Sequence, residues 1–394
     1  MFRTTILEQK KGNTMSDVAI ISCGSYEDAE VQAAVERGIS LLGGAGKFVQ
    51  PDEKILLKLN WLSGDPPEKC VTTHPAVFRA VARVFQSAGA KISYGDSPGF
   101  QSPESAAKKT GAAEVADQLN IPLADFHEGK EVHFAEGHQN KKFIISNAVL
   151  ESDGVISLPK MKTHAFQRVT GAIKNQFGCI PGALKGEFHV KMPSAYDFAK
   201  MLIDLNTFVH PRLYIMDGIM AMEGNGPRGG DPRKMNVLLL STDPIALDAT
   251  MCRLMNLDPA LVLTNRAGEE MGAGTYHAEN IRLLGDAMEG FIAKDYVVNR
   301  DPDSSESKKS RPSFIKEAIT PKPYIIAEKC VRCGICVRMC PVTPKVVDWH
   351  DGNKSNPPTY QYERCIRCYC CQEVCPESAI QVKVPFLRRL LDRK

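Results

Sequence analysis

Two cysteine runs dominate this sequence: "KCVRCGICVRMCP", from Lys329 to Pro341, and "RCIRCYCCQEVCP", from Arg364 to Pro376. In each run four cysteines are separated by two, two and three residues, and a proline follows the last one. The repeated cysteines are Cys330, Cys333, Cys336 and Cys340 in the first run, and Cys365, Cys368, Cys371 and Cys375 in the second. This spacing gathers several thiols on tight loops, so it predicts a metal-binding unit.

The spacing resembles that of bacterial ferredoxins with two [4Fe–4S] clusters. Three cysteines on one tight loop can bind one face of a cubane cluster, and the fourth ligand has to come from a distant residue. In two-cluster ferredoxins the fourth cysteine of each run binds the other cluster. The resemblance therefore implies one cluster bound by Cys330, Cys333, Cys336 and Cys375, and a second bound by Cys365, Cys368, Cys371 and Cys340.

Zinc and disulfides are the alternative uses of these cysteines. A zinc site commonly takes two C-x-x-C pairs, whereas here three steps run consecutively, twice. Disulfides would need an oxidising compartment. The remaining cysteines are scattered and odd in number, namely Cys23, Cys70, Cys179, Cys252 and Cys370. The pattern therefore favours iron–sulfur clusters in a reducing compartment, with Cys370 outside both ligand sets.

Composition excludes several other classes of protein. The 394 residues allow two or three domains, and 43% hydrophobic with 24% charged residues is ordinary for a soluble globular protein. A formal charge of +3 does not favour nucleic acid as a partner. No secretory signal is recognisable, and no stretch approaches the roughly 18 apolar residues of a membrane helix. We therefore expect a cytoplasmic protein.

Short apolar runs recur before the cysteines, separated by segments with helical periodicity such as "HPAVFRAVARVFQSAGA". The runs are "VAIISC", "KILLKLN", "KISYGDSPG", "KFIISN", "GVISLPK", "LYIMDG" and "NVLLLSTDP". Continuous apolar runs that alternate with helices are typical of buried parallel strands. They predict an α/β fold, with a largely parallel sheet and helices on both faces, followed by a small α+β ferredoxin-like domain with two clusters.

Changes in composition predict the domain boundaries. We expect a flexible arm over residues 1–16, the α/β domain over 17–298 and the two-cluster domain over 321–384. A polar segment rich in proline and serine, 299–320, reads as a linker. Residues 385–394 form a short basic tail, expected to be a short helix packed on the two-cluster domain.

Polar residues follow several of the predicted strands. Ligands bind outside the carboxyl ends of the strands in open α/β sheets, and Asn60, Asp96, Lys160 and Asp217 stand at these positions. We expect these side chains to converge on one site. Asp243 also follows a strand, but the proline after it suits a helix N-cap instead.

The segment "LPKMKTHAFQRVTGAIKNQFG" concentrates basic residues between apolar ones. It lacks the acidic partners four residues away that a solvated helix face usually has. One interpretation is a pocket in which lysines hold a carboxylate or phosphate and His164 transfers protons. The other is a positively charged surface loop.

Two further segments supply candidates. "MEGNGPRGGDP" contains Glu223 and Arg228, and His74 precedes a proline, either as the start of a helix or as a pocket residue. The predicted catalytic residues are His164, Lys160, Lys162, Lys174, Asp96 and Glu223. The predicted substrate-binding residues are Asn60, His74, Asn175, Asp217 and Arg228.

Seven motifs carry a family resemblance. "KLNW", "THPAV", "GDSPG", "LPKMKTH", "TGAIKNQFG", "DGIMAMEGNGP" and "STDPIALDA", in this order and followed by the cysteine runs, resemble the domain of unknown function 362 joined to a two-cluster ferredoxin module. The likeness spans roughly Val18 to Pro376. It implies an iron–sulfur protein of bacteria or archaea, without a settled reaction.

Two functions are compatible with these features. The first is a ferredoxin-linked oxidoreductase that passes electrons between a soluble partner protein and an anionic substrate or cofactor in the α/β domain. The second is an electron-transfer or assembly subunit whose α/β domain docks a partner protein. No motif requires a further organic cofactor, so its presence is left open, and a non-redox enzyme with structural clusters is a weaker third interpretation.

Overall fold

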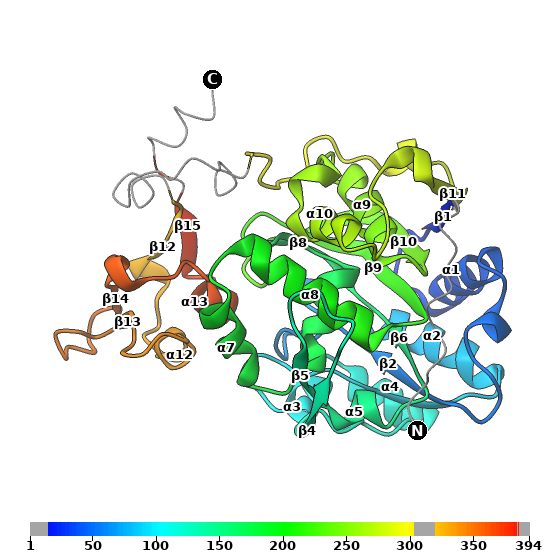
Figure 1. Cartoon of the computed structure of the whole chain (residues 1–394), viewed down its shortest axis with the longest axis horizontal. Helices are drawn as coiled ribbons and strands as arrows, with labels where there is room; N and C mark the ends of the chain where they lie inside the picture. The colour runs from blue at the N-terminus through cyan, green and yellow to red at the C-terminus, as the bar shows by residue number, and fades with distance from the viewer. Residues whose placement is uncertain (1–14, 303–319, 384, 386–394) are drawn as a thin grey trace.

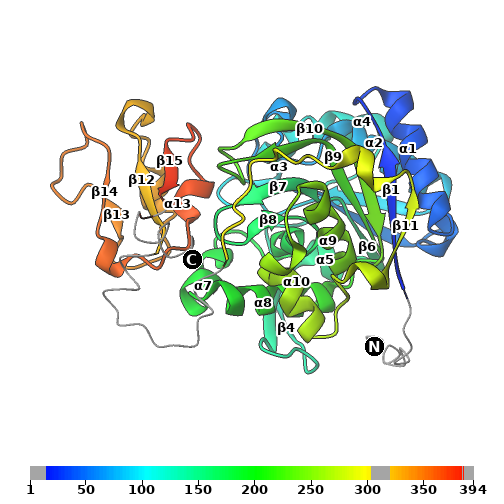
Figure 2. The ribbon, with the colours of Figure 1, turned by 90° about the horizontal axis from the view of Figure 1, so that it is seen from above.

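The structure is a computed structural model that describes residues 15–302, 320–383 and 385. Most of the predicted arm, linker and tail lies outside these described residues. The rest forms a large α/β domain and a smaller module that contains both cysteine runs. The two lie side by side in both views, with the module in orange and red (Figures 1 and 2).

A mixed sheet of nine strands forms the centre of the α/β domain. The strands are β1 (Ser16–Ser22), β2 (Lys54–Lys58), β3 (Lys91–Gly95), β6 (Gly154–Ser157), β7 (Lys160–His164), β8 (Arg168–Thr170), β9 (Leu213–Glu223), β10 (Asp231–Ser241) and β11 (Ile281–Gly285). Their order is β11-β1-β10-β9-β6-β2-β3, and β7 pairs with β8 and β9. Neighbours from β9 to β3 are parallel, whereas β10 is antiparallel to both of its neighbours.

Helices cover both faces of this sheet (Figure 2). One face carries α1 (Asp28–Leu41), α2 (Pro75–Ser87), α3 (Pro103–Lys109) and α4 (Ala112–Leu119), and the other carries α6 (Ala172–Asn175), α8 (Ala195–Val209), α9 (Pro244–Leu254) and α10 (Leu263–Glu270). Successive strand residues point to opposite faces, so Leu57 packs under α1 and α2 while Leu56 packs under α8. The predicted α/β class is confirmed.

Local sequence signals start two of these helices. The Nδ1 atom of His74 accepts the backbone N–H of Ala76 at 3.2 Å, just before α2. The Oδ1 atom of Asp243 accepts the backbone N–H groups of Ile245 and Ala246 at 2.8 and 3.0 Å, just before α9. Each cap is followed by proline, which suits the first helical position because its missing N–H needs no partner there.

Two predicted strands differ in their pairing. The strand β5 (Lys142–Ser146) pairs with β4 (Gly129–His133) in a separate two-stranded sheet, next to the short helix α5 (Asn147–Leu150). Because β10 is antiparallel, its carboxyl end lies at the opposite edge of the sheet. Asp243 accordingly accepts the hydroxyl of Ser16, which begins β1, at 2.6 Å. It therefore lies away from the other polar strand ends.

The cysteine module consists of two similar halves. The strand β12 (Lys322–Ile325) pairs with β15 (Ile380–Lys383), and β13 (Val347–Asp348) pairs with β14 (Thr359–Tyr360). The third cysteine of each run lies in a short helix, α12 (Ile335–Arg338) or α13 (Cys370–Glu373). Figures 1 and 2 show α13 on the side that faces the α/β domain, close to α7 (Leu184–Lys191).

Candidate functional site

A buried ion pair lies where β2 and β3 end. Lys58 Nζ is 2.7 Å from Asp96 Oδ1, and both side chains are almost fully buried. Lys58 Nζ also donates to the backbone oxygen of Asn175 at 3.0 Å, and Asn60 Nδ2 donates to Asn175 Oδ1 at 2.9 Å. Parallel strands end at the same edge of the sheet, which explains why Asn60 and Asp96 both lie beside the contact of Lys58 with Asn175.

A second ion pair joins β7 to β9. Asp217 Oδ2 accepts from Lys160 Nζ at 2.7 Å and from the backbone N–H of His74 at 3.0 Å, while its Oδ1 accepts from the hydroxyl of Tyr26 at 2.8 Å. The rings of Tyr26 and His74 stack with their centroids 3.5 Å apart. Burial lowers the pKa of His74 to about 4, so this imidazole is neutral at pH 7.

Lys162 and Lys174 differ from these paired lysines. Among the residues that the structure describes, neither forms an ion pair. Lys162 is 1% exposed, and its Nζ donates to the backbone oxygen of Val71 at 2.6 Å. Burial and the neighbouring charges of Lys174 and Lys160 lower the pKa of Lys162 to about 7. Lys174 is partly exposed and lies 4.7 Å from the ring centroid of Phe177. The "LPKMKTH" segment is thus a buried strand and not a surface loop.

A carboxylate from the cysteine module faces His164. The Nδ1 atom of His164 accepts the backbone N–H groups of Phe166 and Gln167 at 2.9 and 3.2 Å, so the Nε2 atom carries the proton of the neutral ring. This Nε2 atom lies 3.2 Å from Oε1 of Glu373, which belongs to α13. The pair is close but not aligned as a hydrogen bond, and both atoms are buried without another partner in the described residues.

Neighbouring basic side chains favour the ionised form of Glu373. Burial alone would raise the pKa of Glu373, but its interactions with His164 and Lys174 outweigh burial and lower this pKa to about 2. Burial in turn lowers the pKa of His164 and of Lys174. The arrangement is therefore a carboxylate surrounded by basic groups from the other domain.

Hydrogen bonds fix α13 to the loop between β9 and β10. Gln372 Nε2 donates to the backbone and side-chain oxygens of Asn225 at 2.9 and 3.0 Å, and to the backbone oxygen of Gly226 at 3.1 Å. Arg228 Nη1 donates to the backbone oxygen of Val374 at 2.7 Å, while its Nε and Nη2 atoms donate to Asp65 at 2.9 and 3.0 Å. The glycine-rich loop thus contacts the module directly.

Some predicted residues have other partners, and some important ones were not predicted. Glu223 accepts the backbone N–H of Val297 at 2.9 Å and lies 3.8 Å from Arg233. Lys58 and Tyr26 were missed, although a lysine inside the apolar run "KILLKLN" was a usable signal for the first. No sequence signal pointed to Glu373, because its proximity to His164 arises from contact between two domains.

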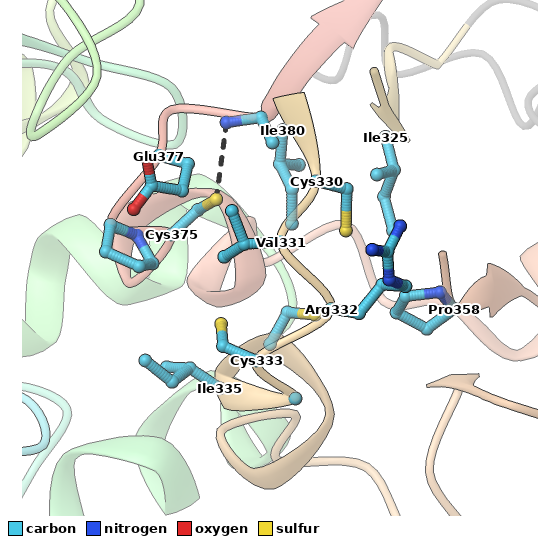
Figure 3. A pocket seen from close by; sticks show the side chains of 14 residues that line it. Ile325, Cys330, Val331, Arg332, Cys333, Ile335, Pro358, Cys375, Glu377 and Ile380 are labelled. Carbon is cyan, nitrogen blue, oxygen red and sulfur yellow. Dashed lines mark hydrogen bonds between the residues drawn. The ribbon is translucent and has the colours of Figure 1, made fainter. Parts of the chain in front are cut away.

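Four cysteines line one pocket in the module. They are Cys330, Cys333 and Cys336 of the first run and Cys375 of the second, around a pocket that opens to solvent. Figure 3 shows Cys330, Cys333 and Cys375 around this space, with Val331, Ile335 and Ile380 beside them. The backbone N–H of Ala379 donates to Cys375 Sγ at 3.3 Å. Four thiols with apolar neighbours and a hydrogen bond to sulfur suit an iron–sulfur cluster.

In the other run, Cys371 belongs to the helix that faces the α/β domain. Cys371 is buried in α13, next to Gln372 and Glu373, and the hydroxyl of Tyr360 donates to its sulfur at 3.3 Å. Cys340 and Cys371 belong to the same small core, with Val346, Val347 and Ile380. In the described ranges, no three or more His, Cys, Asp or Glu side chains converge on a position for one metal ion.

Two known proteins are similar to this chain over most of its length. A thylakoid-associated protein of Synechocystis sp. is 37% identical over 266 residues, which cover 67% of this chain and 82% of that protein. A lactate racemase apoprotein from Thermoanaerobacterium thermosaccharolyticum has a TM-score of 0.40 at 12% identity, over 63% of this chain. This chain spans 59% of that structure.

Family models account for both parts of the molecule. Residues 329–379 match the 4Fe-4S dicluster domain, which covers both cysteine runs. Residues 55–253 match the domain of unknown function DUF362, which includes β2, β7, β9 and the polar groups between them. The chain is therefore a member of the DUF362 family that carries a 4Fe-4S dicluster ferredoxin domain.

Proposed function

We propose that the protein is an iron–sulfur oxidoreductase that exchanges electrons between a soluble redox protein and an anionic substrate or cofactor in the α/β domain. The single observation that carries this proposal is the contact between Glu373 and His164 at 3.2 Å. Glu373 lies two residues from Cys371 and two from Cys375. The cysteine module therefore meets the α/β domain at its group of basic side chains.

The cysteines supply the ligands for two clusters. One set is Cys330, Cys333, Cys336 and Cys375, and the other is Cys365, Cys368, Cys371 and Cys340. The shared pocket of the first set supports the crossed arrangement, since it combines cysteines from both runs. When bound, clusters of this type exchange single electrons at potentials set by hydrogen bonds to sulfur and by solvent exposure.

Residues of the α/β domain divide into binding and supporting groups. Lys162 and Lys174 bind the anion, because they form no ion pair within the described residues, and His164 Nε2 holds the proton that a redox reaction of an organic anion requires. The pairs of Lys58 with Asp96 and of Lys160 with Asp217 keep these groups in position. The supporting residues include Asn60, His74 and Asn175, whose hydrogen bonds connect the strand ends.

The partner protein approaches the outer part of the module. Cys333 is exposed, and Val331 beside it is 57% exposed. A soluble electron donor or acceptor can approach this pocket while α13, on the inner side, stays against the α/β domain. In the described part of the chain, no helix has the length and apolar character to cross a membrane. We propose a cytoplasmic location, although the Synechocystis relative is described as thylakoid-associated.

The test uses the whole chain, purified without oxygen. The protein is reduced with dithionite, freed of excess reductant and mixed with fractions of small organic acids, while its visible spectrum reports re-oxidation. We expect a fraction to re-oxidise the unmodified protein but not the double variant His164→Gln/Lys174→Met. Iron and sulfide content serves as the control for intact clusters. Equal re-oxidation of both proteins would contradict the assignment of the site.

The internal pairing of Lys58, Asp96, Lys160 and Asp217 favours one other function. Paired, buried charges also suit a rigid scaffold, so the second candidate is an electron-transfer or assembly subunit whose α/β domain docks a protein. In that case no acid fraction re-oxidises the reduced chain, and a protein partner purifies with it in a fixed ratio. The same experiment thus separates the two candidates.

A further inference from the structure

The carboxylate that approaches the basic side chains of the α/β domain belongs to the cysteine module. Lys162, Lys174 and His164 all belong to the α/β domain. The nearby Asp96 of that domain is already paired with Lys58 at 2.7 Å. Glu373 of the module is the carboxylate that approaches His164. Without Glu373, this part of the α/β domain would be a largely buried group of basic side chains with no carboxylate beside His164.

Such a concentration is costly unless an anion accompanies it. Buried ions lose hydration, and the loss is offset only by close partners of opposite charge. Lys162 is 1% exposed and has one backbone oxygen as its hydrogen-bond acceptor. Its unusual environment lowers its pKa to about 7, mainly through burial. Burial of a lysine without a carboxylate partner is the pattern expected of a site for an anionic ligand.

We propose that Lys162, Lys174 and His164 form a binding site for a small carboxylate, and that Glu373 occupies this site as an internal ligand. The inference rests on the proposed function, since it names the class of anion bound by the α/β domain. A free carboxylate binds by replacing the side chain of Glu373. The module that carries the electrons is then also the part of the molecule that competes with the substrate.

Several features favour a carboxylate over a phosphate. The observed occupant is itself a carboxylate, and its Oε1 atom lies 3.2 Å from the protonated Nε2 atom of His164. In the described residues this Oε1 atom has no aligned donor, so the site holds Glu373 close without hydrogen-bonding it fully. A ligand free to adjust its position can complete the hydrogen bond to Nε2. A small carboxylate therefore replaces Glu373 with a gain in contacts.

The surroundings allow such an exchange. Lys174 is partly exposed, which gives the site an edge toward solvent. The contacts of α13 with the loop are polar, through Gln372 and Arg228. Polar interfaces between domains are typically reversible. As an attached group, Glu373 competes at a high effective concentration, so binding of a free carboxylate to the unmodified protein should be weak.

The experiment measures binding of acetate, and separately of phosphate, to the whole oxidised chain by calorimetry. Glu373→Gln removes the competing charge and keeps the shape of the side chain. If Glu373 occupies the site most of the time, we expect this variant to bind acetate about tenfold more tightly or better, since apparent affinity scales with the vacant fraction. Adding Lys162→Met or Lys174→Met should reverse that gain.

Glu363→Gln is the matched control, because Glu363 is exposed and also lies two residues from a ligand cysteine, Cys365. It should leave acetate binding unchanged.

The visible spectrum verifies that each variant retains its clusters. Glu373→Asp, with a shorter side chain, replaces Glu373→Gln if the latter does not fold. No gain in either variant would overturn the proposal, and phosphate binding as tight as acetate would overturn the carboxylate class. The calorimetry contains no electron donor. A negative result would therefore refute the carboxylate site and could be told apart from failure of the proposed redox function.

Discussion

At the scale of single residues, the site depends on buried charges that are held at short distances. Gly178 shows how little room they have, because a Cβ atom at this position would lie against Asp96 Oδ1 and 2.7 Å from Lys58 Nζ. The glycine is required for space, so it belongs to the same structural unit as the ion pair. The sequence motif "KNQFG" therefore has a physical reason for its last residue.

The variant Gly178→Ala should lose stability. The added methyl group has to separate Lys58 from Asp96, and disruption of a buried ion pair costs about 3 kcal/mol or more. We expect a fall in the thermal midpoint of the α/β domain, measured by circular dichroism with clusters intact. Gly46→Ala is the matched control, since its Cβ would meet no atom within 4 Å. An equal effect of both changes would contradict the spatial role of Gly178.

Lys162 should make carboxylate binding depend on pH. Its pKa is lowered to about 7 by burial and by the charges of Lys174 and Lys160, against the opposing effect of Asp96 and Glu373. The ammonium form binds an anion and the neutral amine does not. In the Glu373→Gln background, acetate affinity should fall about tenfold or more between pH 6 and pH 8. The ammonium fraction of a group with a pKa near 7 falls about tenfold over this range, and loss of the Glu373 charge lowers the pKa of Lys162 further.

The same titration with Lys162→Met added to Glu373→Gln provides the comparison. Methionine has no charge to lose, so the residual affinity should change little over this range. Burial lowers the pKa of His164, which moves the titration of this ring to more acidic pH than the step assigned to Lys162. A full pH step that persists without Lys162 would assign the titration to another group.

At the scale of elements, the sequence predicted where the strands lie along the chain better than how the strands and helices contact one another. The apolar runs matched β1, β2, β3, β6, β9 and β10, because buried strands need continuous apolar residues. Strand direction is not encoded in such runs, which is why the reversal of β10 and the separate pairing of β5 were not predicted. The contact of α13 with the β9–β10 loop depends on how two domains meet, and neither segment alone signals it.

Gln372 is the residue of α13 that should hold the module in place. Its Nε2 atom donates to three oxygens of Asn225 and Gly226, and Gln372→Ala would leave these acceptors without that donor. Loss of a buried donor costs about 1 to 3 kcal/mol. We expect faster hydrogen exchange in the β9–β10 loop and in β7, measured by mass spectrometry.

Gln361→Ala serves as the comparison for this change. Gln361 belongs to the same module, and its side chain interacts with His350 and Arg364, also of the module. Exchange in β7 should therefore match that of the unmodified protein, with the same visible spectrum in both variants. Unchanged exchange in Gln372→Ala would show that other contacts are sufficient for docking.

At the scale of the whole molecule, the described part of the cluster domain contacts the α/β domain at His164 and at the β9–β10 loop, among other positions. The cysteine spacing predicted the cluster domain because ligand geometry restricts sequence strongly. The basic segment predicts an anion site, which stays a prediction, and the proximity of Glu373 to His164 was not predictable from the sequence. Glu373 stands between two ligand cysteines, where its sequence context points to the clusters and not to His164. In the proposed function, contact between the domains joins electron transfer to anion binding.

Pulsed electron paramagnetic resonance with carbon-13-labelled acetate tests this claim most directly. The sample is the Glu373→Gln chain, reduced so that its clusters are paramagnetic. Because Glu373 is two residues from Cys371 and from Cys375, acetate in its place should show carbon-13 coupling to a reduced cluster. The coupling should vanish with unlabelled acetate and when Lys162→Met is added. Acetate that binds by calorimetry but shows no coupling would place the anion away from the clusters and contradict the account.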